Sequence, residues 1–308
     1  MALLVLVINY NNAEETLRCL DSISLCDEDV HIRLVDNGSN AEDIGHLKNS
    51  IRKHLNLELT ESKVNLGFSG GVNLGLHECH IQNYEYILLL NNDATVEPDA
   101  LRLLTRALDE NPEIGGVNPA IFDSRGPEGK VWFGGGVLHQ WAGLVSHNRK
   151  LPSVENDEFD RVRVIPNGYL NGCCLLIRRT ILENLNGLDE NLFMYGDDVD
   201  LSYRMREKGW KLGFVPTAIA HHNVSASTGQ SEVRFNSFRA YYDSRNWILI
   251  QRKRGYKGII PIISQILIIT PYHIVLMISE KTWGSITWYI RGLIDGLMNR
   301  VGRRTELG

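Results

Sequence analysis

The sequence predicts an α/β fold with a mostly parallel central sheet and helices on both of its faces. Over residues 3–111, short and largely apolar segments alternate with amphipathic helical segments. Such strands are typical of parallel sheets that are buried on both sides. With 308 residues, of which 43% are apolar and 22% charged, the chain can bury one large core, or one core with an appendage.

Each strand expected in this first part is followed by a helical pattern. We expect strands at residues 3–8, 30–35, 57–60 and 86–90. We expect helices at residues 14–23, 42–54, 70–80 and 98–111. In the first helix, Leu17, Leu20 and Ile23 recur at helical spacing. The crossovers between parallel strands should be right-handed.

The pattern becomes less regular after residue 112. Several prolines, three consecutive glycines and strand-like segments at 116–122, 131–138 and 161–165 indicate a mixed sheet edge with long loops, which are often functional. Beyond it we expect helices at 178–186, 199–208 and 232–252, and strands at 211–215 and 218–220.

Polar clusters follow three of the expected strands. They read NYNN after the first strand, DNGS after the second and NND after the fourth. One such cluster could simply form a turn, because Asn and Asp bond their own backbone there. However, ligands of open α/β sheets bind beyond the carboxyl ends of the strands. Three clusters at that edge therefore favour one shared site over three unrelated turns.

Charge and cysteine content narrow the function classes. A net charge of −5 with acids and bases interspersed gives no reason to expect nucleic-acid binding. The five cysteines include the adjacent pair Cys173 and Cys174, so we expect a reducing, cytoplasmic setting. The first residues are apolar but lack a basic segment and a cleavage site, and we interpret them as a strand, not a signal peptide.

The run 259–279 contains no Asp, Glu, Lys or Arg and is long enough to span a bilayer as a helix. Pro261 and Pro271 should break or kink such a helix. It could be a buried helical hairpin, an in-plane anchor or a true span. We favour a peripheral or monotopic hairpin on the cytoplasmic leaflet, in contact with the membrane through apolar and basic residues of 252–290, and favour a span least.

A second acidic cluster contains Asp197, Asp198 and Asp200. Three carboxylates so close together repel one another unless a cation or a proton intervenes. Capping of a helix N-terminus could explain one or two of them. About twenty residues later, His221 and His222 end a short apolar strand. A histidine near two acidic clusters is a credible metal ligand or proton carrier.

The order of these motifs resembles the family 2 glycosyltransferases, which are inverting enzymes of GT-A fold. The matching segments run from residue 3 to about 222 and include NLGFSGGVNLGL, LLLNNDATVEPDAL, YLNGCCLLIRR and LDENLFMYGDDVDLSYRMREKGW. The nearest resemblance is to bacterial rhamnosyltransferase-like members. The resemblance implies a Rossmann-like catalytic domain over 1–225 and a helical C-terminal extension over 226–308, either membrane-peripheral or packed on the catalytic domain.

The resemblance also implies a site for a nucleotide-diphospho-sugar, linked to UDP or dTDP. Asp36 matches the position that accepts a hydrogen bond from the imide N–H of the pyrimidine. The other positions implied at the donor are Asn9, Tyr10, Asn11, Asn65, Gly67, Phe68, Asn73 and Asn92. Asp93 matches the last Asp of the family's DxD motif, although Asn91 replaces the first carboxylate. With the diphosphate it would hold Mg²⁺ or Mn²⁺. His221 matches a further metal ligand of some relatives, and His222 is the less favoured of the two.

Asp198 matches the base of the family, which accepts the proton of the attacking hydroxyl in a single inverting displacement. Asp197 is the alternative base. The acceptor, a saccharide or a lipid-linked saccharide, would contact Trp132, Asn171, Gly172 and Cys173. Cys173 could equally be a small buried residue. Arg245 either reaches the diphosphate or only binds the two regions together.

Three other functions remain open at this point. Paired carboxylates also cleave glycosides, so a glycoside hydrolase is one alternative. A non-catalytic homologue that binds nucleotide sugars is another. A nucleotidyltransferase would need a basic glycine-rich loop early in the chain, which this sequence lacks.

Overall fold

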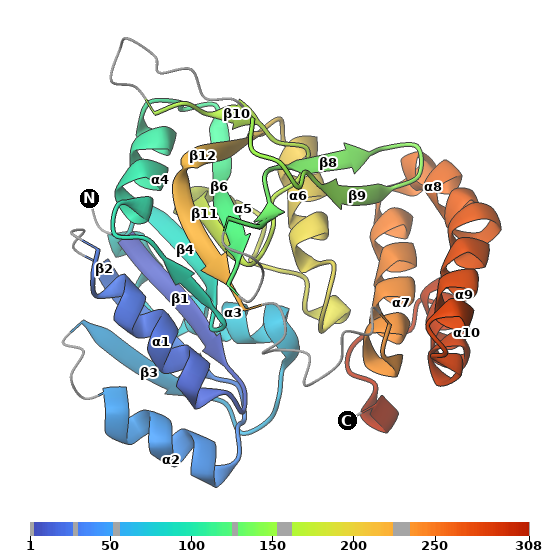
Figure 1. The fold of residues 1–308 in the computed structure, drawn as a ribbon, viewed down its shortest axis with the longest axis horizontal. Helices are drawn as coiled ribbons and strands as arrows, with labels where there is room; N and C mark the ends of the chain where they lie inside the picture. The colour runs from blue at the N-terminus through green and yellow to red at the C-terminus, as the bar shows by residue number, and fades with distance from the viewer. Residues whose placement is uncertain are drawn as a thin grey trace.

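The first third of the chain forms the predicted alternation of strands and helices (Figure 1). The computed structural model describes residues 3–26, 30–51, 56–124, 129–152, 162–223 and 235–307. The strands are β1 (Leu3–Asn9), β2 (Val30–Asp36), β3 (Leu57–Glu61) and β4 (Tyr86–Asn91). The helices are α1 (Ala13–Ile23), α2 (Ala41–Ser50), α3 (Gly67–His77) and α4 (Ala100–Asp109). The expected elements are present, with ends shifted by a few residues.

Strand β1 lies between β2 and β4, and all three run parallel. Asn9 stands beside Asp36 in the register, and Ile8 stands beside Asn91. The polar clusters that follow these strands therefore lie at one edge of the sheet, as the sequence predicted.

The strands that come after β4 make the sheet mixed. They are β5 (Ala94–Val96), β6 (Ile114–Asp123), β7 (Val131–Phe133), β10 (Ile165–Pro166), β11 (Cys174–Arg178) and β12 (Lys211–His222). The ten-stranded sheet has the order β10-β12-β6-β11-β4-β1-β2-β3, with β5 paired to β12 and β7 to β6. Strand β11 runs antiparallel between β4 and β6. It joins the two halves in one sheet.

Two details differ from the expected elements. Strand β12 is one strand with a register shift between Val215 and Ile219, where the sequence predicted two separate strands. The expected strand at 131–138 is divided into β7 and β8 (Gly136–His139), and β8 pairs with β9 (Leu144–His147) in a separate hairpin. The glycines between β7 and β8 interrupt the strand, as glycine often does. Residue 161, part of another expected strand, lies outside the described residues.

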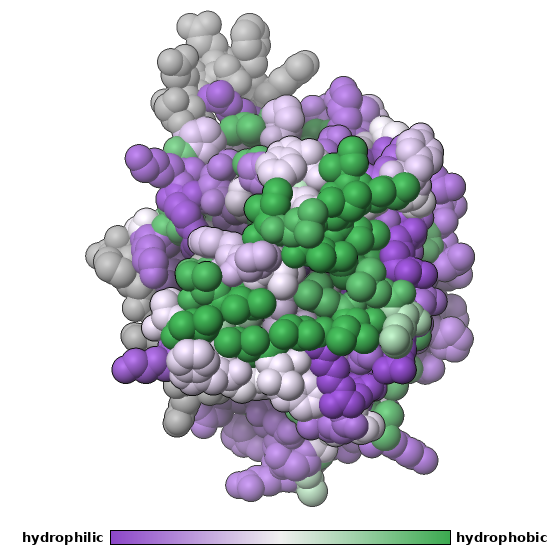
Figure 2. Space-filling view, turned by 90° about the vertical axis from the view of Figure 1, so that its right-hand side faces the viewer, coloured by the Kyte–Doolittle hydropathy of each residue, from purple (hydrophilic) through white to green (hydrophobic). Residues whose placement is uncertain are grey.

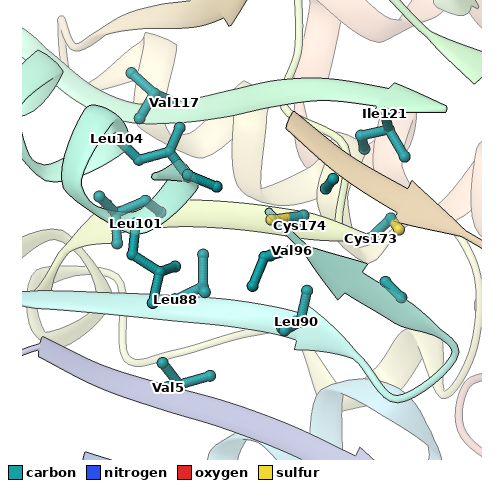
Figure 3. Close-up of a cluster of buried hydrophobic side chains, with 14 of the residues drawn as sticks. Val5, Leu88, Leu90, Val96, Leu101, Leu104, Val117, Ile121, Cys173 and Cys174 are labelled. Atoms are coloured by element: carbon teal, nitrogen blue, oxygen red, sulfur yellow. The ribbon is translucent and has the colours of Figure 1, made fainter. Parts of the chain in front are cut away.

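Apolar side chains pack on both faces of the sheet. Figure 3 shows one of these clusters, in which Leu88 and Leu90 of β4 face Leu101 and Leu104 of α4. The opposite face is covered by α3, α5 (Arg179–Asn184) and α6 (Asp197–Glu207), which bury Leu6, Val72, Leu201 and Met205 among others. Each fully buried leucine contributes about 1.5–3 kcal/mol relative to an exposed one, so this double-sided core anchors the strand ends.

The C-terminal region is helical, as predicted, and α7 packs against the sheet region. Its helices are α7 (Ser237–Lys253), α8 (Ile259–Ser264), α9 (Thr270–Ser279) and α10 (Trp283–Leu297). On one side of α7, the ring of Tyr242 lies 5.3 Å from that of Phe193. On its other side, Ser244 Oγ donates a hydrogen bond of 2.8 Å to the carbonyl of Tyr289 on α10. Helix α7 therefore forms the contact between the sheet region and the outer helices.

Residues 255–279 form one continuous helical stretch, which the two prolines do not break. A π-helical turn at Gln265–Ile269 separates α8 from α9 and directly precedes Thr270-Pro271. Proline clashes with the carbonyl four residues earlier in an α-helix, and a π turn changes that spacing. By length and composition the stretch could cross a membrane, since its 25 residues include a window of mean hydropathy 2.0 that is 22% buried.

The outer helices present a broad apolar face to the surface, visible as the green area in Figure 2. Ile260, Leu267 and Val275 are among its members, each exposed by more than 60%. Two polar residues of the same stretch, Gln265 and His273, point inward instead. Gln265 Nε2 donates to the Tyr289 hydroxyl at 2.8 Å, and His273 Nδ1 lies 3.0 Å from that oxygen. The stretch is therefore amphipathic, and its apolar side faces outward.

Candidate active site at the carboxyl ends of the strands

The ends of β1 and β2 are joined through the buried side chain of Asn9. Its amide nitrogen lies 2.9 Å from Asp36 Oδ1 and 2.9 Å from Asp43 Oδ2. Asp36 also accepts a hydrogen bond from the backbone N–H of Ser39 at 3.1 Å. A carboxylate has about four lone-pair sites, so Asp36 keeps acceptor capacity. Asn9 and Asp36 are thus brought together as predicted.

Tyr10 and Asn11 form the rim of this corner. Tyr10 is 44% exposed. Asn11 has a φ of 52°, a backbone region that Asn tolerates better than most residues, and its Oδ1 accepts a hydrogen bond from the N–H of Asn40 at 2.8 Å. The two loops that follow β1 and β2 therefore support each other. The exposed ring of Tyr10 remains available to a ligand.

The glycine-rich segment at the start of α3 packs against the loop before α6. Gly67 has a φ of 76°, and a Cβ atom there would lie 2.0 Å from the carbonyl oxygen of Phe193. The N–H of Phe68 donates to that same carbonyl at 2.8 Å. Asn65 Oδ1 accepts a hydrogen bond from the N–H of Gly67 at 2.8 Å and so fixes the turn. Glycine is needed here for close packing of two backbone segments.

Asn73 makes structural contacts where the sequence predicted a nucleotide contact. Its amide donates to the carbonyl of Leu188 and accepts from the N–H of Leu188, both at 2.9 Å. It also donates to Glu190 Oε1 at 2.8 Å. Because these bonds use both ends of the amide, we correct the role of Asn73 from donor binding to loop positioning.

Asp93, which follows β4, is buried next to a histidine. It is 4% exposed, and neither carboxylate oxygen has a hydrogen-bond partner among the described residues. Its Oδ1 lies 3.1 Å from Nε2 of His222, without the angle of a hydrogen bond. Both ring nitrogens of His222 also lack a hydrogen-bond partner in the described part of the chain. The preceding Asn92 donates to Thr16 Oγ1 at 2.9 Å, which ties this turn to α1.

The prediction that His221 lies at the metal position, ahead of His222, is wrong. His221 Nε2 lies 2.8 Å from Glu97 Oε1 at the surface. Successive side chains of a strand point to opposite faces, so of two adjacent histidines at the end of β12 only one can face Asp93. That residue is His222, which is 7% exposed.

Trp132, which the resemblance assigned to the acceptor, lies beside the Asp93–His222 pair. Its ring centroid lies 4.7 Å from that of His222 and 4.9 Å from that of His147. Burial lowers the pKa of His147 to about 4, and Arg149 adds to this effect. His147 is therefore neutral at physiological pH and serves as an aromatic neighbour.

The second acidic centre is Asp198, in the first turn of α6. Its Oδ2 accepts a hydrogen bond from the N–H of Gly172 at 3.0 Å, and its Oδ1 accepts one from the N–H of Val199 at 2.8 Å. Burial raises the pKa of Asp198, while these N–H groups oppose the rise. The residue stays partly exposed. A partly exposed carboxylate with fixed geometry can accept a proton from a bound hydroxyl.

Residues 171–173 connect the two acidic centres. Gly172 contacts Asp198, and the next residue, Cys173, accepts a hydrogen bond from the N–H of Asn91 through its carbonyl at 2.9 Å. Burial raises the pKa of the Cys173 thiol, and the nearby charges of Asp93 and Asp198 both add to it. Both carboxylates are therefore near one side chain.

The thiol of Cys173 itself belongs to the core, so we correct its predicted contact with substrate to a packing role. The side chain is 4% exposed and lies in the main apolar cluster (Figure 3). Asn171 is held by Asn118 of β6, with hydrogen bonds of 2.8 Å and 2.9 Å to its backbone. The Asn171 side chain is buried, and its Oδ1 accepts a hydrogen bond from the N–H of Cys173 at 3.0 Å.

Asp197 lies deeper than Asp198 and bonds to α3. It is 7% exposed and accepts a hydrogen bond from the hydroxyl of Ser69. Burial raises the pKa of Asp197 to about 7; the Ser69 hydrogen bond opposes this rise and the Asp198 charge adds to it. Asp200 instead pairs with Arg204 at 2.7 Å and with Lys253 at 2.9 Å. Asp200 is therefore held by two basic side chains and has a structural role.

Arg245 is not a diphosphate ligand, which corrects the prediction. It is 1% exposed, its Nη2 donates to the carbonyl of Leu192 at 2.8 Å, and its Nη1 donates to that of Gly302 at 2.5 Å. Its guanidinium also lies over the ring of Tyr242 at 4.7 Å. These contacts bind the helical region to the loop before α6, which was the alternative role considered.

Several residues of the site were not found from the sequence. Ser69, Asn118, His147 and Asn246 each contact a predicted site residue or its loop from a distant part of the chain. Ser69 lies within the glycine-rich segment that was singled out, but its partner Asp197 is 128 residues away. Such contacts follow from the tertiary arrangement and leave no local pattern.

Comparison with known proteins identifies the family. The model of glycosyl transferase family 2 matches residues 4–185, more than half of the chain, and its match ends before Asp197. Over 269 residues the chain is 27% identical to an N-acetylglucosaminyl-diphospho-decaprenol L-rhamnosyltransferase of Mycobacterium tuberculosis, with 82% of this chain and 85% of the relative covered. Over 306 residues it is 26% identical to the low-salt glycan biosynthesis hexosyltransferase Agl10 of Haloferax volcanii, with 97% and 92% covered.

The fold is also that of a solved glycosyltransferase. A mannosyltransferase from Pyrobaculum calidifontis, in complex with GDP-Man and Mn²⁺, superposes with a TM-score of 0.58 at 14% identity, covering 97% of this chain and 87% of its own. At this identity the likeness shows the GT-A fold alone. Together with the family match and the full-length relatives, it establishes that the chain is a glycosyltransferase of GT-A fold that belongs to glycosyl transferase family 2.

Proposed function

We propose that this glycosyltransferase moves a hexosyl or deoxyhexosyl group from a UDP- or dTDP-sugar to a hydroxyl of a lipid-linked saccharide, with inversion and with Asp198 as general base. The observation that carries this proposal is the pair of acidic centres on either side of residues 171–173. A donor between them would present its anomeric carbon near Asp198 and its diphosphate near Asp93. The naming of the mycobacterial relative supports a lipid-linked acceptor.

The donor would be bound at the ends of β1 and β2. The Asp36 carboxylate, fixed by Asn9 and the N–H of Ser39, has acceptor capacity for the imide N–H of uracil or thymine. The exposed ring of Tyr10 at the rim could cover the base or ribose. Neither contact distinguishes the two pyrimidines, so the proposal includes both.

The residues present fit a divalent cation. Asp93 and His222 together contribute four buried polar atoms that lack hydrogen-bond partners within the described residues. Such atoms are costly unless a ligand or ion meets them. A hard divalent ion prefers oxygen ligands, and one imidazole nitrogen is compatible with Mn²⁺. Within the described ranges no group of three or more His, Cys, Asp or Glu side chains could hold a metal, so the diphosphate would complete the shell. The ion would neutralise charge on the departing diphosphate.

Asp198 is the better general base of the two carboxylates. Its oxygens are held by two backbone N–H groups and it is partly exposed, so it can meet an acceptor hydroxyl. Asp197 is buried and bonded to Ser69. Proton transfer to a positioned carboxylate is typically worth about 10²–10⁴-fold.

The test compares Asp198→Asn with Asp197→Asn, because both variants are isosteric. Transfer is measured with dTDP-L-rhamnose and a panel of UDP-sugars, with Mn²⁺ or Mg²⁺ and an N-acetylglucosaminyl-diphospho-prenol acceptor. We expect Asp198→Asn to lose about 10²–10⁴-fold in kcat while it still binds UDP or dTDP in a titration. Retention of most of the rate by Asp198→Asn would contradict the role of Asp198. Release of free sugar without acceptor at the full rate would favour a hydrolase.

We also propose that the apolar face of 259–278 rests on a membrane surface, which would bring the site close to a lipid-linked acceptor. Of the basic residues before it, Arg252 and Lys257 remain exposed. The other two contribute little, because Lys253 pairs with Asp189 and Asp200, and Arg254 lies over the ring of Tyr203 at 3.9 Å. Binding should therefore be mainly apolar and only weakly sensitive to salt.

Leu267 and Leu25 provide a matched pair for testing this contact, because both are 69% exposed and only Leu267 lies on the apolar face. We expect Leu267→Glu to reduce co-sedimentation with vesicles of phosphatidylethanolamine and phosphatidylglycerol, and Leu25→Glu to leave it unchanged. Equal binding by both variants, or loss of wild-type binding at high salt, would contradict the proposed apolar contact.

A further inference from the structure

The loop before α6 has an unusual backbone. Phe193, Tyr195 and Gly196 have φ values of 64°, 66° and 81°. Positive φ is uncommon for residues other than glycine and costly for bulky side chains. Two aromatic residues in this region within a few positions need external support. Because Asp197 and Asp198 follow directly, the conformation of this loop determines where α6 begins.

The support comes from one side chain of α7. The amide nitrogen of Asn246 lies 2.9 Å from the carbonyl oxygen of Leu192, 2.7 Å from that of Met194 and 2.8 Å from that of Tyr195. Asn246 is 1% exposed, and its Oδ1 accepts a hydrogen bond from Nε of Arg245 at 2.9 Å. One buried amide therefore satisfies the carbonyls on both sides of the positive-φ residues.

The same helix also limits the end of the loop. A Cβ atom at Gly196 would lie 3.0 Å from Cδ1 of Ile250 and 3.8 Å from Cβ of Asn246. The carbonyl of Gly196 then accepts the N–H of Asp200 at 2.8 Å, at the start of α6. The loop that α7 restrains therefore leads directly into the first turn of α6, which carries Asp198.

We propose that Asn246 is a positioning residue for catalysis: it holds residues 192–196 in the conformation that presents Asp198 to Gly172 and to the acceptor hydroxyl. This rests on the proposed role of Asp198. It means that the helical extension takes part in building the catalytic centre. The hydrogen bonds of Asn246 go to this loop and to Arg245, and none goes to Asn9 or Asp36 at the ends of β1 and β2, where we propose that the donor binds.

The experiment compares Asn246→Asp with Ser244→Ala. Asn246→Asp keeps the shape of the side chain but turns an oxygen toward three carbonyl oxygens. Ser244 lies on the same helix and is equally buried, but its hydroxyl bonds to Tyr289 of α10, away from the loop. Asn246→Ser, which is too short to reach the carbonyls, is the second variant in case the first does not fold.

We expect Asn246→Asp to lower kcat by about 10²-fold with little change in the KM for the donor, since small misplacements of a reacting group have effects of this size. Hydrogen exchange of residues 188–201 should become faster. Ser244→Ala should change neither. Unchanged kcat and unchanged exchange in both Asn246 variants would overturn the proposal, as would equal losses in Ser244→Ala.

A double-mutant cycle tests whether the two elements act together. Gly196→Ala strains the same loop, so its effect on kcat should be less than additive with that of Asn246→Asp, and additivity would contradict the proposal. The outcome is separable from the proposed function. If Asp198→Asn keeps its rate while Asn246→Asp loses it and the loop opens, Asn246 still positions the catalytic loop and the base must be reassigned.

Discussion

Replacing Asp197 by asparagine should stabilise the protein above neutral pH and leave its stability unchanged at low pH. Burial raises the pKa of Asp197 from 3.8 to about 7, so the folded state holds a proton on this carboxyl where the unfolded state does not. The stability contributed by the protonated group is present below pH 4 and is lost as the pH rises through about 7. Asparagine stays neutral throughout and keeps an oxygen to accept the Ser69 hydrogen bond.

The size of the effect follows from the shift of about 3 pKa units. At about 1.4 kcal/mol per unit, the upper limit is on the order of 4 kcal/mol at pH 8. Relaxation of the site would reduce this value, so we expect a gain of a few kcal/mol. The measurement is urea unfolding of Asp197→Asn and of the wild type at pH 4, 6 and 8.

Asp99→Asn serves as the control for this measurement, because Asp99 is exposed and pairs with Arg102 at 2.7 Å. It should show no gain at any of the three pH values. The reasoning would be refuted if Asp197→Asn were no more stable than the wild type at pH 8, or if its gain were the same at pH 4 and pH 8.

Two further predictions concern the metal pair and the glycine-rich segment. His222→Ala should abolish the dependence of turnover and of UDP affinity on Mn²⁺, because His222 lies beside Asp93. His221→Ala should leave both near wild type, because His221 pairs with Glu97 instead. The reverse order in a Mn²⁺ titration would restore the original assignment. Gly67→Ala should destabilise the protein by several kcal/mol in urea unfolding, because a Cβ there would lie 2.0 Å from a backbone oxygen. Gly129→Ala, also at positive φ but in open space, should cost less. Equal losses would show that backbone strain alone explains the effect.

The strands that could be predicted from the sequence are those that are buried on both faces of the sheet. The strands β1 and β4 are uniform apolar runs with polar ends, and β2 is a largely apolar run that contains His31 and Arg33. This pattern predicts both the strands and their shared edge. Strand β11 was not assigned as a separate strand, because CCLLIRR is compatible with a strand or with the start of a helix. Its antiparallel direction between β4 and β6 depends on long-range pairing that no local pattern records.

From the sequence we could predict which residues belong to the candidate site, but not which way their side chains point. Motif spacing identifies positions along the chain, and it singled out Asp93, Trp132 and Asp198. In the structure Trp132 lies beside His222, which neighbours Asp93, and Asp198 accepts a hydrogen bond from Gly172. The choice between His221 and His222 depends on which face of β12 meets the site, and a register shift earlier in that strand affects the alternation. The resemblance assigned Asn73 to the donor, and Arg245 was left between a diphosphate contact and a structural role. Both instead satisfy backbone carbonyls inside the fold.

The position of α7 has a practical consequence for shortened forms of the enzyme. Ending the chain near residue 225 would remove the outer helices with their exposed apolar side chains and keep the predicted catalytic domain. It would also uncover Phe193 and leave the carbonyls of Leu192, Met194 and Tyr195 without their shared donor. Such a fragment should aggregate and be inactive. A soluble enzyme is better sought by placing charged residues on the outward side of α8 and α9, with the whole chain retained.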